Sequence, residues 1–133
     1  MSYPWQEKYL VNEYVDTIAR SPIIRFYPTA VAKYAKTSPS RTFKYLIEMA
    51  EEGRLNLLWE LRCPNYECLR TIQISKNASD FPVEFTCRTC GEFYEVDESM
   101  YFPAFEVNSE YKKFIRESSA TSTKKKTLSL SLS

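Results

Sequence analysis

Four cysteines constrain this chain of 133 residues more than any other feature of its sequence. They form two close pairs: four residues separate Cys63 from Cys68, and two residues separate Cys87 from Cys90. Two such thiolate pairs supply the four tetrahedral ligands of a structural Zn²⁺ site. Gly91 follows the second pair and permits the positive φ that a tight turn needs there. The sequence therefore predicts one structural zinc ion, with two disulfides or four ordinary buried thiols as the alternatives.

Two cysteine pairs at these spacings resemble the zinc ribbon, a family of small metal modules built from β-hairpins. The resemblance covers about residues 61–98, and it implies that Cys63, Cys68, Cys87 and Cys90 are the metal ligands. The first pair departs from the family pattern, which usually has two residues between the cysteines and a glycine after each pair. Rubredoxins share this kind of turn and bind iron, so thiolate chemistry alone leaves iron open.

The composition removes most routes to catalysis. The chain contains no histidine, which excludes a Ser-His-Asp triad and a histidine general base. Its only glycines are Gly53 and Gly91, so no glycine-rich phosphate loop is present. A zinc ion held by four thiolates has no open position for a reacting water molecule. We therefore expect a protein that is not an enzyme and has no evident small-molecule substrate.

Size and hydrophobicity favour a folded protein away from membranes. The chain has 133 residues, of which 44% are hydrophobic, and this is enough to form the core of one compact domain or of two very small ones. It begins without the basic and then apolar segments of a secretory signal, and no apolar run is long enough to span a membrane. We expect a cytoplasmic protein with no membrane contact, and this location favours metal binding over disulfides.

Hydrophobic periodicity and turn residues predict an α+β fold. Thr29 and Ser38 suit the N-caps of the second and third helices, and Gly53 suits the end of the third. The predicted parts are a helical half (1–60), a zinc ribbon with a C-terminal strand and short helix (61–117), and a disordered Ser/Thr/Lys tail (118–133). The predicted helices are 5–20, 30–36, 39–52 and 110–117, and the predicted strands or extended segments are 55–62, 69–75, 82–86, 92–97 and 101–107.

Three helices followed by a strand and a hairpin resemble the winged helix over about residues 10–75. In that family the third helix enters the DNA major groove and the hairpin, or wing, touches the DNA backbone. The resemblance places the turn from Cys63 to Cys68 at the tip of the wing. The metal module would then continue directly from the helical half, with no linker between them.

The third helix supplies the candidate nucleic-acid-binding residues. Arg41, Lys44 and Tyr45 are predicted to face outward, where the two cations meet phosphate or base edges and the ring stacks on a base. Acidic residues follow on the same helix, so the alternative is a solvated face on which Lys44 pairs with Glu48. Residues 20–62 carry eight basic and four acidic side chains, which is a thin electrostatic footprint for DNA.

These features lead to two functional hypotheses. The first is a non-enzymatic zinc-binding adaptor that docks on a protein partner in a larger assembly. The alternative is a winged-helix DNA-binding transcriptional regulator stabilised by a structural zinc. Aromatic residues late in the chain either pack over the metal module or form a partner surface; they are Tyr94, Tyr101, Phe102, Phe105 and Tyr111.

Overall fold

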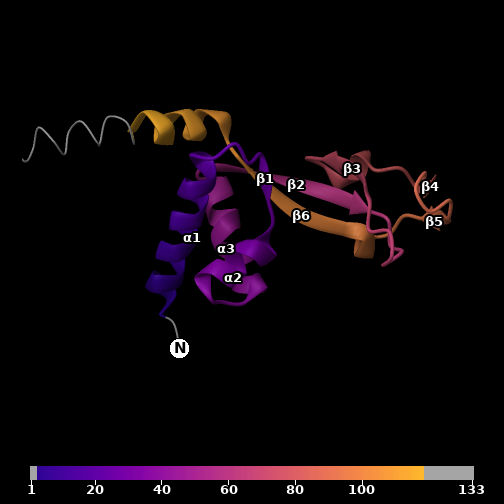
Figure 1. Ribbon diagram of the computed structural model, residues 1–133, viewed down its shortest axis with the longest axis horizontal. Helices are drawn as coiled ribbons and strands as arrows, with labels where there is room; N and C mark the ends of the chain where they lie inside the picture. Colours follow the sequence, from indigo (N-terminus) through magenta and orange to yellow (C-terminus); the bar gives the residue numbers. More distant parts are fainter. Residues whose placement is uncertain (1–2, 119–133) are drawn as a thin grey trace, which may run out of the picture.

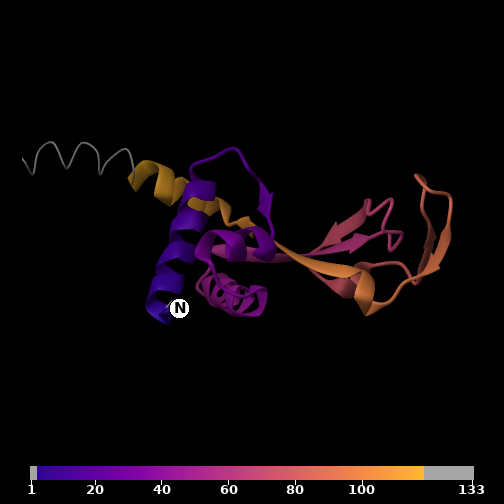
Figure 2. The same cartoon turned by 60° about the horizontal axis from the view of Figure 1, so that its bottom comes forward.

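A computed structural model describes residues 3–118 of the chain and has the predicted α+β class. Helices gather at one end of the molecule, and two long strands run from them to a group of short strands at the other end (Figure 1). The same division is seen from a second direction in Figure 2. The predicted disordered tail, 118–133, lies outside the described residues except for Ser118, which lies in a helix described over residues 109–118.

The three predicted N-terminal helices are present as α1 (Pro4–Ala19), α2 (Pro28–Ala35) and α3 (Pro39–Glu51). Ser38 caps α3 as predicted, since its side chain accepts a hydrogen bond of 3.2 Å from the backbone N–H of Arg41. Gly53 follows α3 with φ +84°, also as predicted. The predicted cap at Thr29 is wrong: α2 begins two residues earlier than predicted, because Pro28 fits the first helical turn and Tyr27 takes the cap position.

Four strands form one antiparallel sheet in the order β1-β6-β2-β3. The predicted strands 55–62 and 69–75 are β2 (Leu55–Arg62) and β3 (Thr71–Ser75), and they pair with each other. The sequence did not predict that β6 (Tyr101–Val107) lies between β2 and β1 (Arg25–Phe26).

Pro103 is the reason that β6 is hard to recognise as a central strand. A proline lacks the N–H that a central strand donates to its neighbour. Pro103 pairs with Trp59 of β2, but β1 contacts β6 only at Phe105 and Glu106. The proline therefore lies where β6 has a neighbour on one side only, and the sheet tolerates it.

The cysteine-containing segment is inserted between β2 and β6. It includes β3, a second hairpin made of β4 (Glu84–Thr86) and β5 (Phe93–Glu95), and two short 3-10 helices, Ala78–Asp80 and Glu98–Met100. Because β2 and β6 pair from Leu55–Val107 through to Leu61–Tyr101, the two strands lead without interruption from the helices to this segment. The two predicted parts, 1–60 and 61–117, therefore share strands rather than a linker.

Two hydrophobic cores lie along these shared strands. The first lies among the helices and includes Leu46 and Phe105, both 0% exposed. The second lies under the cysteine segment and is built around Leu61, Phe81 and Met100. Strand β2 contributes Leu55 to the first core and Leu61 to the second, so one strand stabilises both.

Most of the late aromatic residues pack inside, as one of the two predictions stated. Phe105 is buried in the first core, and Tyr94 and Tyr101 pack against the second. The hydroxyl of Tyr111 donates a hydrogen bond of 2.7 Å to Asp16, which fastens the helix 109–118 to α1. Phe102 is the exception in this set, with 37% of its surface exposed. No helix in residues 3–118 is both long enough and apolar enough to cross a membrane.

Candidate metal centre

The four cysteine sulfurs form one cluster, in which all lie within 4.8 Å of one another. The Sγ atoms of Cys63 and Cys90 are 3.7 Å apart, and those of Cys68 and Cys87 are also 3.7 Å apart. A tetrahedron with Zn–S bonds of about 2.3 Å has sulfur–sulfur edges of about 3.8 Å. A disulfide would need about 2.05 Å, so these thiols are free. The cluster therefore has the dimensions of a tetrahedral four-thiolate metal site.

The first pair lies in the turn between β2 and β3. The backbone N–H of Cys63 donates to the carbonyl of Arg70 at 2.8 Å, and that of Cys68 donates to the carbonyl of Asn65 at 2.8 Å. Leu69 occupies the place where zinc ribbons usually have glycine, and it adopts a left-handed conformation with φ +49°. The first turn thus has a left-handed residue after its second cysteine, as the second turn has at Gly91, at the cost of strain in a non-glycine residue.

The second pair lies in the turn between β4 and β5. The backbone N–H of Cys87 donates to the carbonyl of Glu92 at 2.9 Å, and Gly91 donates to the carbonyl of Cys87 at 2.8 Å. Gly91 has φ +75°, as the sequence predicted. Both pairs therefore lie at the turns of two antiparallel hairpins.

The thiols of the cluster differ in acidity because their surroundings differ. Hydrogen bonding from the backbone of Cys90 lowers the pKa of the Cys87 thiol to about 6. Burial, together with the neighbouring thiols, raises the pKa of the Cys63 thiol to about 12. A cation bound among the sulfurs would stabilise the thiolate form of Cys63, which is the harder of these two thiols to deprotonate.

Three residues outside the cysteines lie at the cluster. Nη1 of Arg70 donates a hydrogen bond of 2.6 Å to the hydroxyl of Thr89, which ties the first turn to the second. Burial, together with the nearby Cys63 and Cys90 sulfurs, raises the pKa of Tyr94 to about 12. The sequence does not indicate Arg70 or Thr89 for the metal site, because their proximity depends on how the two hairpins face each other.

A buried carboxylate lies on β2, three residues before Cys63. Glu60 is 2% exposed, and no local feature of the sequence indicates its burial. It accepts hydrogen bonds from Tyr27 at 2.8 Å, Thr71 at 2.6 Å and the Nε of Arg62 at 3.1 Å. Burial alone would raise the pKa of Glu60, but these three donors outweigh it and lower the pKa below the usual value.

The candidate nucleic-acid residues lie together on α3, but only in part as predicted. Lys44 is exposed, and so is Arg41, whose guanidinium pairs with Glu7 at 2.9 Å. The outward position predicted for Tyr45 is wrong: the residue is 9% exposed, and its hydroxyl donates to Glu7 at 2.9 Å. Tyr45 turns inward because α1 packs beside α3 and brings the buried Glu7 carboxylate within reach. The pair predicted between Lys44 and Glu48 is replaced by one between Lys8 and Glu48 at 3.8 Å.

Comparisons of the chain with protein-family models, with curated proteins and with solved structures find no match. The functional argument therefore depends on the geometry of the cysteine cluster and of the surfaces around it.

Proposed function

We propose that this protein binds one structural zinc ion and acts as a non-enzymatic adaptor that docks on a protein partner. The observation that carries the proposal is the sulfur spacing of 3.7 Å across the cluster, in both Cys63–Cys90 and Cys68–Cys87. That spacing matches the edge of a zinc–thiolate tetrahedron, which is about 3.8 Å. Iron has similar thiolate geometry, so metal analysis decides between the two ions.

A structural role for the metal follows from its surroundings. Four thiolates fill the coordination sphere of zinc and leave no position for water or substrate. Cys63 and Cys87 are 0% and 1% exposed, so half of the ligand set is closed to solvent. Zinc at this place holds the β2–β3 turn against the β4–β5 turn. The metal therefore stabilises the fold and takes no part in a reaction.

The adaptor role is supported by apolar side chains on the surface. Tyr66 is 81% exposed, Val83 is 83% exposed and Phe93 is 56% exposed, all within the cysteine segment. Aromatic residues are enriched at protein–protein interfaces, where they supply large rigid contacts. A segment with this surface, fixed by a metal, is suited to bind another protein.

DNA binding is the second candidate, and the basic groove beside α3 favours it. Lys8, Arg41 and Lys44 line that groove together with Tyr45 and Glu48. Two of the three cations are already paired with carboxylates, Arg41 with Glu7 and Lys8 with Glu48. Pairing leaves less positive charge for phosphate, which is why we place DNA binding second.

Affinity purification tests the adaptor role. The zinc-loaded chain is used as bait in a lysate of its own organism, beside the variant Cys87→Ser, and enriched proteins are then purified and remixed with it. We expect one protein to form a complex with the wild-type chain from pure components and not with the variant. If no enriched protein re-forms a complex from pure components, or if nuclease treatment releases it, the adaptor role is wrong.

A further inference from the structure

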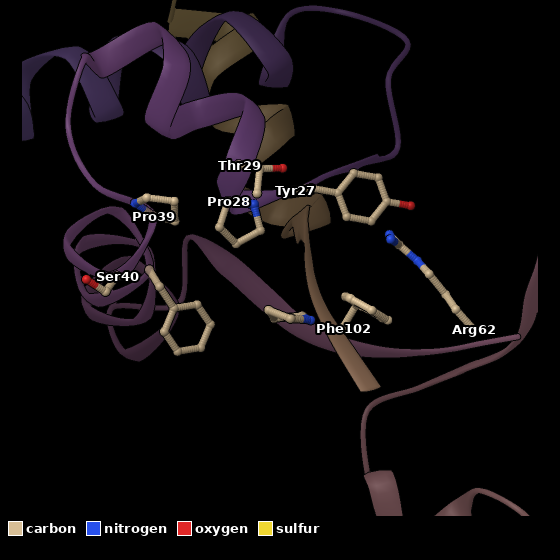
Figure 3. Close-up of a pocket in the computed structure, with 9 residues that line it drawn as sticks. Tyr27, Pro28, Thr29, Pro39, Ser40, Arg62 and Phe102 are labelled. Atoms are coloured by element: carbon tan, nitrogen blue, oxygen red, sulfur yellow. The ribbon is translucent and has the colours of Figure 1, made fainter. Parts of the chain in front are cut away.

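A solvent-open pocket lies where the starts of α2 and α3 meet strands β2 and β6. Its volume is about 570 Å³, which is in the range of ligand-binding pockets. Figure 3 shows Tyr27 and Arg62 on one side of it, Pro39 and Ser40 on the other, and Pro28 and Phe102 between them. The lining consists of three prolines, three aromatic residues, two hydroxyl residues and one arginine: Tyr27, Pro28, Thr29, Pro39, Ser40, Phe43, Arg62, Phe102 and Pro103.

Arg62 is the single charged residue of this lining. Its guanidinium carbon lies 5.0 Å from the centre of the Tyr27 ring and 4.5 Å from the centre of the Phe102 ring, so the two rings hold it by cation–π contacts. Its Nε donates to the buried Glu60 at 3.1 Å, and this bond fixes the plane of the guanidinium. Among residues 3–118, the Nη groups of Arg62 have no hydrogen-bond partner. A fixed cation therefore offers free donors beside an apolar wall.

Two helices begin at the same pocket and add positive potential to it. Pro28 starts α2 and Pro39 starts α3, and the next residue of each helix, Thr29 and Ser40, also lines the pocket. Proline has no N–H, and the N–H groups of Ala30 and Arg41 donate to Tyr27 and Ser38. Thr29 and Ser40 therefore supply the backbone N–H groups that carry partial positive charge at these two helix starts. Glu60 pairs with Arg62 at 3.1 Å but is only 2% exposed, and no acidic residue lines the pocket itself. The groups that face the opening are therefore complementary to an apolar group that carries a negative charge.

We propose that this pocket binds a short peptide segment of the partner protein in which an apolar side chain stands beside a carboxylate. The proposal rests on the adaptor function and names what the adaptor recognises. Of the residues that line the pocket, only Pro28 is buried, so the site is open to solvent. An open site suits a segment of another protein better than a small molecule, which is usually enclosed. Aromatic and proline side chains supply the apolar contact, as in grooves that bind extended peptides. The carboxylate accepts from the Nη groups of Arg62.

No side chain of the chain's own C-terminal segment supplies a carboxylate. Residues 119–133 contain three consecutive lysines and no acidic side chain. Duplex DNA does not match either, since the apolar walls beside Arg62 offer its phosphates a single cation. A peptide from another protein is therefore the occupant that fits both the charge and the lining.

The test is selection from a phage-displayed library of random peptides on the zinc-loaded, full-length chain. Selected sequences are expected to place Asp or Glu within about two residues of an aromatic or branched aliphatic residue, which is the reach of neighbouring side chains in an extended peptide. A selected peptide is then titrated against a copy with Asn for Asp, or Gln for Glu. Loss of the charge should weaken binding about tenfold, which is the effect of one charge-assisted hydrogen bond.

Variants of Arg62 locate the binding. The acidic peptide and its amide copy should bind the Arg62→Gln variant with equal affinity. Lys76→Gln is the control, because it removes an exposed cation in a loop outside the pocket, and it should preserve the tenfold difference in affinity. If Arg62→Gln fails to fold, Phe102→Ala replaces it and should weaken both peptides severalfold. The proposal would be overturned if the selected peptides contained no acidic residue or if no peptide were selected. It would also be overturned if Arg62→Gln kept the difference in affinity between the acidic peptide and its amide copy. A free aryl carboxylate, such as 3-phenylpropanoate, that binds as tightly as the selected peptide would overturn it as well.

Failure of this proposal can be separated from failure of the adaptor function. If the purified partner still binds Arg62→Gln and Phe102→Ala with wild-type affinity, the adaptor function stands and the pocket is not its site. If the wild-type chain binds no partner at all, the adaptor function itself is wrong.

Discussion

Tyr27 donates a hydrogen bond of 2.8 Å to Glu60, and this bond joins the start of α2 to the strand that leads into the first cysteine. The Glu60 carboxylate is 2% exposed. It also accepts from Thr71, the first residue of β3. One carboxylate therefore connects the helices, the long strands and the base of the first cysteine turn. This network should carry a measurable part of the stability of the fold.

Glu60→Gln is expected to lower the free energy of unfolding by about 2 kcal/mol, since hydrogen bonds to a charged group contribute about 1.5–3 kcal/mol. The amide keeps the shape of the carboxylate but turns an N–H donor toward groups that themselves donate. Urea denaturation measures the change. Glu84→Gln in β4 is the matched control, because Glu84 is exposed and should tolerate the change within about 0.5 kcal/mol. Equal effects of the two variants would show that the network is not stabilising.

The lowered pKa of Glu60 predicts how this contribution depends on pH. The folded state favours the carboxylate form, so the contribution is complete above the ordinary carboxyl pKa of about 4.3. It is lost as the pH falls through the lower pKa of the folded state. The stability difference between wild type and Glu60→Gln should therefore shrink below about pH 4. Metal content is measured at each pH, so that only samples with equal metal are compared. A difference that grows on acidification would contradict this account.

The residues that directly follow the two cysteine pairs, Leu69 and Gly91, should respond in opposite ways to substitution. Gly91→Ala forces a side chain into φ +75° and is expected to destabilise the protein by about 1–2 kcal/mol. No atom lies within 4 Å of the added Cβ, so the loss measures backbone strain alone.

Leu69→Gly should stabilise the protein by about 0.5 kcal/mol, because relief of the strain at φ +49° exceeds the added entropy of the unfolded chain. Leu69→Ala, which removes the half-exposed side chain but keeps the strain, is the control. Thermal unfolding of the zinc-loaded proteins compares the three variants. If Leu69→Gly is less stable than Leu69→Ala, the left-handed conformation is not a source of strain.

Fluorescence anisotropy with duplex DNA across a range of salt concentrations tests the second candidate function. Because Arg41 and Lys8 are already paired, we expect at most weak binding with a shallow salt slope. If the protein is a DNA-binding regulator, Lys44→Gln should weaken binding and reduce the salt slope by about one. Lys76→Gln removes an exposed cation outside the groove and is therefore the control for the loss of any one positive charge. A steep salt slope that depends on Lys44 would favour the regulator over the adaptor.

Local signals were sufficient to predict much of this fold and its candidate centre. Ser38, Pro39 and Gly53 determine where α3 begins and ends, and these residues act on their own neighbours in the chain. The cysteine spacing predicted a cluster of four, and the sulfurs do come together. The helix signals act over a few residues, whereas each cysteine pair is local but the cluster joins sulfurs 19 and 27 residues apart.

The features that were missed depend on contacts between distant segments. Glu60 alternates with apolar residues as an exposed strand residue would, and its burial depends on Tyr27 and Thr71. Tyr45 was assigned to the outer face of α3 because nothing near it in the sequence announces the carboxylate of Glu7. The burial of Glu60 and Tyr45 depends on which helices and strands pack together, and the residues next to them in the sequence do not indicate that packing.

Metal analysis of the purified chain tests the central claim most directly. Elemental mass spectrometry of protein prepared without added metal should find about one zinc per chain, as a four-thiolate site requires. Cys87→Ser should lose the zinc and most of the folding stability, since metal binding and folding are coupled in such modules. A wild-type chain without metal, whose four cysteines are joined in two disulfides, would contradict the account. So would a Cys87→Ser variant that melts at the wild-type temperature.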